Sequence, residues 1–197
     1  MQTGDLVLFA RRRGVHVFSR AVDWATGSDY SHVGLVLVNP TYIHKYLRGT
    51  YLWQSTSTKV PNAEDNKHVF GVQLTPLADV IRNNRDYTLY VRHLSSGASA
   101  FNGKVLHRIH TTVHERPYAV CPRHWAAAAL HRGDTAGSPP SFWCSALVGF
   151  VLVRLGVLEH TTNWRLLRPV DLSTEAPVPL PLRLSVSYEK ERPLTTL

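Results

Sequence analysis

A cysteine at the start of a predicted helix is the feature of the sequence that most strongly suggests chemistry. The stretch Pro139–Gly156 is predicted to form one helix, with Ser141 as its N-cap and Cys144 at about the third helical position. A helix N-terminus carries roughly +0.5 of an elementary charge, which favours the nucleophilic thiolate over the thiol. Backbone N–H groups there can also hold a developing oxyanion. From this helix alone, a buried structural cysteine is the alternative interpretation.

Two polar residues on predicted strands could act together with this cysteine. The stretch Ser31–Val38 is apolar on both faces, which is typical of a strand covered on both sides, and it contains His32. Gly34 leaves room beside His32 on the same face. Gln54 lies on the next predicted strand, Thr50–Ser55. The structural alternatives are a core histidine with a satisfied hydrogen bond and a glutamine that faces water at a strand end.

Other residues of metal-ligating type are interpreted as structural. His107, His110 and His114 lie three and four residues apart on a predicted helix, without an acidic or cysteine companion, so we expect solvated surface histidines. Cys121 precedes Pro122 at a second predicted helix start, and it is therefore a rival nucleophile. Cys121 and His124 lack a second pair with zinc-binding spacing. We therefore predict no metal site and no cofactor.

The remaining elements run from a strand-rich part to a helix-rich part. We predict an α+β fold with a mainly antiparallel sheet, because the regular strand–helix alternation of a doubly wound fold is missing. The residues from Lys190 to Leu197 are expected to fray. Further strands are expected at Asp5–Phe9, Val69–Leu74, Tyr87–Arg92 and Leu180–Tyr188, and further helices at Val15–Ala25, Pro76–Asn83, Phe101–Val113 and Pro122–Arg132.

Length and composition favour a single globular domain that comprises residues 1–197, since 44% of the 197 residues are hydrophobic. The two cysteines are too few for a disulfide framework. The sequence shows neither a signal-peptide pattern nor an apolar run long enough to cross a membrane. We therefore expect a cytoplasmic protein. The formal net charge of +8 would suit an anionic membrane surface and peripheral association with it. Nucleic acid is not expected as the partner, because the arginines are scattered and no binding motif accompanies them.

The sequence contains four short segments with a distinctive order: Thr3–Phe9 (TGDLVLF), Asp29–Val36 (DYSHVGLV), Leu52–Thr56 (LWQST) and Phe142–Val148 (FWCSALV). Together they resemble the circularly permuted papain-like superfamily. This NlpC-type group includes a YiiX-like branch, a poxvirus branch and relatives of lecithin–retinol acyltransferase. The similarity covers about residues 3–175, and a fifth segment, Arg168–Ser173, is similar to the "TP-x-D-F-S" segment of the group.

The resemblance implies a fold and three site residues. The fold is a sheet or half-barrel packed against the helix that carries the cysteine. Cys144 matches the nucleophile of the family, His32 matches the base, and Gln54 matches the polar residue that orients the imidazole. The family often has an acidic residue where this chain has Gln54, although papain-type enzymes use an amide in the same role. Cys121 has no counterpart, which favours a structural role for it.

Three functions follow as hypotheses. The first is a cysteine hydrolase that cleaves an amide, peptide or isopeptide bond through a thioester on Cys144, with His32 as base. The second is a lipid-directed thiol acyltransferase or esterase at a membrane surface, which the basic charge and the five tryptophans and eight tyrosines favour. The third is a catalytically weak member that serves as a binding module, which Gln54 favours.

Overall fold

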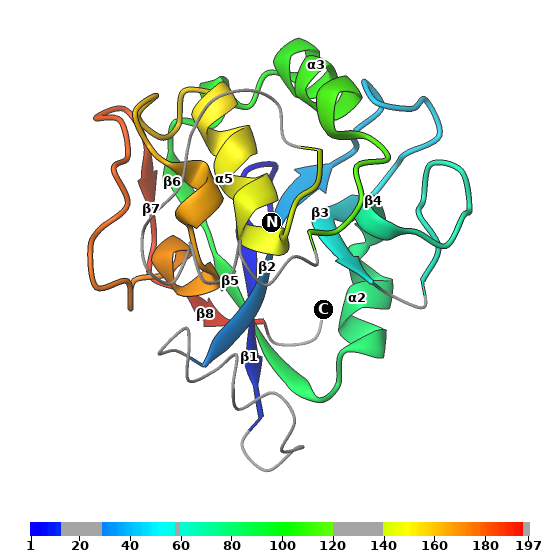
Figure 1. Ribbon diagram of the computed structural model, residues 1–197, viewed down its shortest axis with the longest axis horizontal. Coiled ribbons are helices and arrows are strands. Elements are labelled where there is room, and N and C mark those ends of the chain that lie inside the picture. Colours follow the sequence, from blue (N-terminus) through cyan, green and yellow to red (C-terminus); the bar gives the residue numbers. More distant parts are fainter. Residues whose placement is uncertain (13–28, 58–59, 120–139, 195–197) are drawn as a thin grey trace.

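The computed structural model describes residues 1–12, 29–57, 60–119 and 140–194, and these form an α+β fold, as predicted (Figure 1). Its main sheet has six strands in the order β4-β3-β2-β1-β5-β8, and all neighbouring strands pair antiparallel. A second sheet pairs β6 with β7. The strands are β1 (Leu6–Arg11), β2 (Tyr30–Val38), β3 (Thr50–Ser57), β4 (Phe70–Pro76), β5 (Tyr87–Arg92), β6 (Leu94–Ser96), β7 (Ser187–Tyr188) and β8 (Arg192–Pro193).

Helices cover both faces of the main sheet because the central strands are apolar on both sides. Alternate residues of β1, such as Leu6 and Leu8, join a core with α5 (Cys144–Arg154) and α3 (Gly103–Val113). Val7 and Phe9 point to the other face, where they pack with α2 (Leu77–Asn83). Short 3₁₀ helices complete the structure: η2 (Ala98–Ala100), η3 (Trp164–Leu166) and η4 (Pro169–Leu172).

The start of α5 lies where pairing between β2 and β3 stops. Their register runs from Val38 opposite Thr50 to Leu35 opposite Trp53. Beyond that pair, the Ser55 hydroxyl of β3 donates to the carbonyl of Phe142 at 2.7 Å, in the residues that lead into α5. The chain therefore brings a helix N-terminus against two sheet strands, each of which carries one predicted site residue.

The predicted helix around Cys144 is present but begins later than expected. Its first residue is Cys144, its N-cap is Trp143, and no side chain caps it, so the prediction that Ser141 is the N-cap is wrong. The reason is that Phe142 is held in an extended bridge with Tyr118, in which its N–H donates to the carbonyl of Pro117. Cys144 therefore sits even closer to the positive end of the helix than the sequence indicated.

The C-terminal part differs more from expectation. The alternating stretch Leu180–Tyr188 was predicted as a strand, but only Ser187–Tyr188 forms one, and Leu184 is fully exposed. The expected fraying after Lys190 is wrong for Arg192–Pro193, which pair with β5 as β8. The helices predicted at Val15–Ala25 and Pro122–Arg132 lie outside the described residues.

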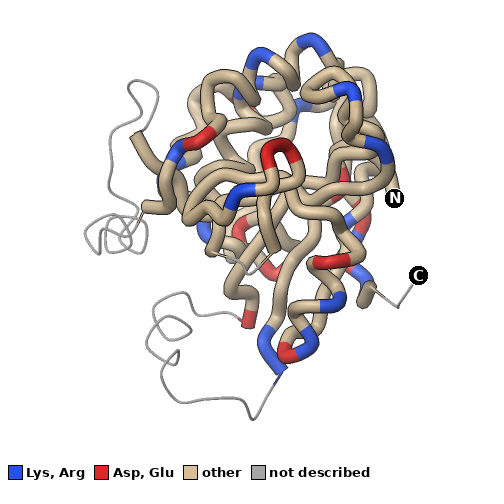
Figure 2. The backbone as a smooth tube through the Cα atoms, turned by 90° about the vertical axis from the view of Figure 1, so that its right-hand side faces the viewer, with Lys and Arg blue, Asp and Glu red and all other residues tan. Residues whose placement is uncertain are grey.

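The Lys and Arg residues of the described ranges belong to several separate segments of the chain. In the view of Figure 2, Lys and Arg occur on segments around the molecule, with Asp and Glu between them, consistent with the scattered pattern of the sequence. Across the part of the chain that the structure describes, we find no helix with both the length and the apolar character needed to cross a bilayer.

Candidate active site

The three residues singled out in the sequence lie together. His32 Nε2 is 2.8 Å from Gln54 Oε1, and the ring of His32 also forms a hydrogen bond with the thiol of Cys144. Because an amide oxygen only accepts, Nε2 carries the hydrogen, which leaves Nδ1 to exchange a proton with the thiol. Cys144 and Gln54 are 5% and 4% exposed, whereas His32 between them is half-buried.

The surroundings of this pair favour its charged form. Burial raises the pKa of the Cys144 thiol, but the charge and hydrogen bond of His32 and the backbone N–H groups of Val33 and Ser145 outweigh burial and lower the pKa. For His32, burial lowers the pKa, whereas the charge of Cys144 and the hydrogen bonds to Cys144 and Gln54 outweigh burial and raise the pKa. The opposite shifts are those of a thiolate–imidazolium pair.

Gln54 is itself held in place by the neighbouring strand. Its Nε2 donates to the hydroxyl of Thr75, on β4, at 3.0 Å, and Thr75 is buried. The alternative of a glutamine facing water is therefore wrong. With its amide N–H₂ engaged by Thr75, the glutamine presents its oxygen to His32, and this fixes which ring nitrogen is protonated.

The ring of His32 is also held by packing. Phe9 lies opposite His32 in the β1–β2 register, and the two rings meet edge to face with centroids 4.7 Å apart. The space above Gly34 is occupied by Leu52, whose side chain lies 2.6 Å from where a Cβ at position 34 would be. The room that the sequence suggested beside His32 is therefore filled by a core side chain.

Side-chain hydrogen bonds anchor the N-terminal turn of α5. Ser145 Oγ donates to the carbonyl of Leu167 at 2.6 Å, and Trp143 Nε1 donates to the same carbonyl at 3.4 Å. On the opposite side, Ser55 holds the carbonyl of Phe142. These contacts position Cys144 between the sheet and the segment that contains η3.

Tyr118 is a residue near the thiol that the sequence analysis did not identify. Burial and the negative charge of Cys144 both raise the pKa of its phenol, so the hydroxyl stays protonated. The segment that carries it is fixed to β4, because the Tyr118 N–H donates to the carbonyl of Phe70 at 3.0 Å. No local pattern points to Tyr118, since its proximity depends on the bridge to Phe142.

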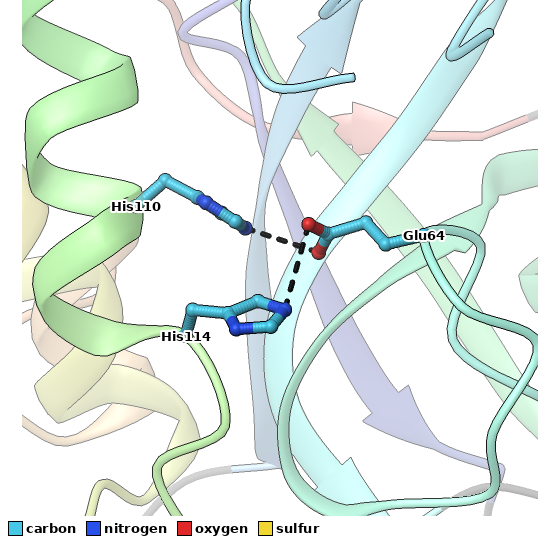
Figure 3. Close-up of side chains that lie close together, drawn as sticks. All are labelled: Glu64, His110 and His114. Atoms are coloured by element: carbon cyan, nitrogen blue, oxygen red, sulfur yellow. Dashed lines mark hydrogen bonds and ion pairs between the residues drawn. The ribbon is translucent and has the colours of Figure 1, made fainter.

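The expectation of three solvated histidines on α3 is wrong for His110. His107 is exposed, whereas His110 is 6% exposed and its Nε2 lies 3.0 Å from a carboxylate oxygen of Glu64. His114 is 3.6 Å from the other oxygen of the same carboxylate (Figure 3). The acidic companion comes from the loop between β3 and β4, far away in sequence, so helical spacing could not reveal it.

Comparison with solved structures gives a distant structural likeness. The chain is similar to the metalloprotein YiiX from Escherichia coli O157:H7, described as DUF1105, with 18% identity, 97% of each chain covered and a TM-score of 0.49. No protein-family model and no curated protein matches the sequence. The inference of function below therefore depends on the geometry of the site.

Proposed function

We propose that the protein is a cysteine hydrolase of the permuted papain-like type, which cleaves an amide, peptide or isopeptide bond. The observation that carries this proposal is the continuous chain of contacts from Cys144 through His32 to Gln54. In papain-like enzymes the cysteine precedes the histidine and the amide residue along the chain. Here the histidine strand and the amide strand come first and the cysteine helix follows, which is the permuted order.

The first half of the reaction forms a thioester. The Cys144 thiolate attacks the substrate carbonyl carbon, and the oxyanion that develops is held by N–H groups at the start of α5. The amide N–H of Cys144 has no partner within the helix, because the first intrahelical bond runs from Leu147 to Trp143. As the carbon–nitrogen bond breaks, the imidazolium of His32 gives its proton to the leaving amine.

The second half regenerates the Cys144 thiolate. Neutral His32 takes a proton from water, the hydroxide attacks the thioester carbonyl, and the carbon–sulfur bond breaks. The carboxylic acid leaves, and Cys144 and His32 return to the charged pair. Gln54 keeps the ring in one orientation through both halves, because its oxygen accepts the Nε2 hydrogen in each state.

The acyl-enzyme is the species that tests this proposal. Wild-type protein is incubated with activated esters and with peptide and isopeptide amides, quenched in acid and measured by intact mass spectrometry. We expect a mass increase equal to the acyl group, removed by neutral hydroxylamine, in the wild type and not in Cys144→Ser. Turnover of amides by the wild type supports hydrolysis. No adduct from any ester or amide, with a fully folded protein, contradicts the proposal and favours a binding module.

The lipid-directed alternative has weaker support from the described residues. Trp53 and Trp164 are 1% and 6% exposed and Trp143 is partly buried, so these tryptophans contribute to the core and not to a membrane-facing surface. Acyl transfer from a phospholipid in anionic vesicles, with no turnover of peptide or isopeptide amides, would instead establish that alternative.

A further inference from the structure

A second group of chemically capable side chains lies outside the proposed active site. His110 and His114 are one turn apart at the C-terminal end of α3, and both side chains point toward Glu64 on the facing loop (Figure 3). Each of the three offers one atom of the kind that binds zinc, and no two of these atoms are farther apart than 4.8 Å.

The distances between these atoms are close to those of a zinc site. Ligand atoms of a tetrahedral Zn²⁺, each about 2.0–2.1 Å from the ion, lie about 3.3 Å from one another. His110 Nε2 lies 3.0 Å from one oxygen of the Glu64 carboxylate and His114 Nε2 lies 3.6 Å from the other oxygen, and with one atom from each residue all separations are at most 4.8 Å. Binding one ion would require a shift of the His114 side chain, which is the most exposed of the three at 33%.

The burial of two of the three side chains distinguishes this group from an ordinary ion pair on the surface. The side chains of His110 and Glu64 are only 8% and 12% exposed, so both groups have lost most of their water. One carboxylate faces two imidazole nitrogens, and the two rings lie 5.0 Å apart and tilted by 49°. A divalent cation between the three groups would be bound by both imidazoles and by the carboxylate at the same time.

We infer that Glu64, His110 and His114 form a Zn²⁺ site with a solvent molecule as the fourth ligand. Two imidazoles and one carboxylate are a ligand set that zinc uses when one position remains open. The ion would fasten the loop of Glu64 to the end of α3. The chain continues from His114 to Arg116, whose carbonyl accepts a hydrogen bond from Val72 of β4, and then to Tyr118 beside Cys144.

The test uses the full chain with Cys144→Ser, because a thiol beside an imidazole is itself able to bind zinc. The metal-free protein is titrated with Zn²⁺ by isothermal calorimetry, and with Co²⁺ by visible absorption. We expect one ion per chain, a Co²⁺ spectrum of nitrogen and oxygen ligands without a thiolate band, and a raised melting temperature with Zn²⁺. In His110→Ala, His114→Ala and Glu64→Gln, we expect Zn²⁺ affinity to fall by at least tenfold, which is about 1.4 kcal/mol.

The matched control is His107→Ala, which removes an exposed histidine from the same helix and should bind Zn²⁺ like its parent. If His110→Ala does not fold, as circular dichroism would show, the half-exposed His114→Ala and the isosteric Glu64→Gln decide the outcome. Absence of Zn²⁺ binding by the parent overturns the inference, and so does equal binding by all four variants. Since Cys144 is absent throughout, neither result depends on the proposed hydrolase activity.

Discussion

At the scale of single residues, the candidate site holds its histidine with an amide oxygen and not with a carboxylate. Gln54 Oε1 holds His32 at 2.8 Å, but an uncharged oxygen stabilises the imidazolium less than a carboxylate does. The lowered pKa of Cys144 therefore depends on the thiolate–imidazolium contact and on backbone N–H groups, which work against burial. Two substitutions separate these contributions.

His32→Ala is expected to move the pH dependence of Cys144 alkylation upward. In the wild type the pKa of Cys144 is lowered, so the thiolate is present at lower pH than for an ordinary cysteine, whose pKa is about 8.5. Without His32, burial remains while the opposing charge and hydrogen bond are lost, and the pKa rises. The measurement is the iodoacetamide rate at Cys144 against pH. Cys121→Ser is the control and should keep the wild-type profile, and coinciding profiles for His32→Ala and the wild type would show that the pair is not assembled.

Gln54→Ala and Gln54→Glu are expected to act in opposite directions on the pKa of His32. The alanine variant loses a hydrogen bond to a charged group, worth about 1.5–3 kcal/mol, so turnover should fall by about 10- to 100-fold. The glutamate variant adds a negative charge beside the imidazolium, which should raise the pKa of His32 and extend the alkaline limb of the pH–rate profile. Equal pH–rate profiles for both variants and the wild type would mean that Gln54 does not orient the ring.

At the scale of elements, the position of α5 is decided by contacts that its own sequence does not reveal. The apolar residues after Cys144 predict a helix, and its end near Gly156 is as expected, with Gly156 at φ 69°. Its start could not be predicted, because Phe142 is drawn into a bridge with Tyr118. Similarly, the strands β1 to β5 follow from short apolar runs or from alternation, whereas the stretch before Ser187 alternates without pairing to a neighbour over most of its length.

The histidines of α3 show the same limit. Their spacing was visible in the sequence, but the burial of His110 follows from its contact with Glu64 across the fold. A family resemblance identified His32, Gln54 and Cys144 as candidates. The sequence could not reveal the contact between Gln54 and Thr75 or the position of Tyr118, for the same reason. Contacts between distant segments are fixed by packing, and one-dimensional patterns do not encode them.

Ser55→Ala is expected to loosen the entry to α5. The substitution removes the 2.7 Å hydrogen bond to the Phe142 carbonyl and should lower the free energy of unfolding by about 0.5–1.5 kcal/mol. The rate of Cys144 alkylation should fall as well, because the thiol is positioned by the same turn. Urea unfolding and alkylation kinetics are the measurements. Ser57→Ala, an exposed change on the same strand, is the control and should leave both unchanged. An alkylation rate for Ser55→Ala equal to that of the wild type would show that this bond does not position the thiol.

At the scale of the whole molecule, residues near the end of the described chain connect segments that lie far apart in the sequence. Glu191 is 7% exposed, and its carboxylate accepts hydrogen bonds from Tyr30 at 3.4 Å and from the backbone and hydroxyl of Thr174. Next to it, β8 pairs with β5, and Arg92 reaches the carbonyl of Leu172 at 2.9 Å. The N-terminal strands, η4 and the C-terminal residues are thereby connected.

Glu191→Ala should destabilise the whole fold by roughly 1–3 kcal/mol, because the backbone and hydroxyl donors of Thr174 lose their acceptor in a partly buried place. Chemical denaturation with circular dichroism as the signal measures this. The neighbouring Glu189→Ala is a matched control, since the Glu189 side chain is 42% exposed and pairs with the exposed Arg192. It should change stability by less than about 1 kcal/mol. Equal effects of the two substitutions would contradict the role given to Glu191.

The order of the elements has a consequence for the newly made chain. His32 and Gln54 belong to early strands, whereas Cys144 follows only after α3 and the segment that contains Tyr118. A contact between groups so far apart forms late, because closing a long loop is slow. Until then the cysteine is an ordinary thiol, with neither the imidazole nor the backbone donors that lower its pKa. The lowered pKa of Cys144 is therefore a property of the folded chain and not of the local sequence around the cysteine.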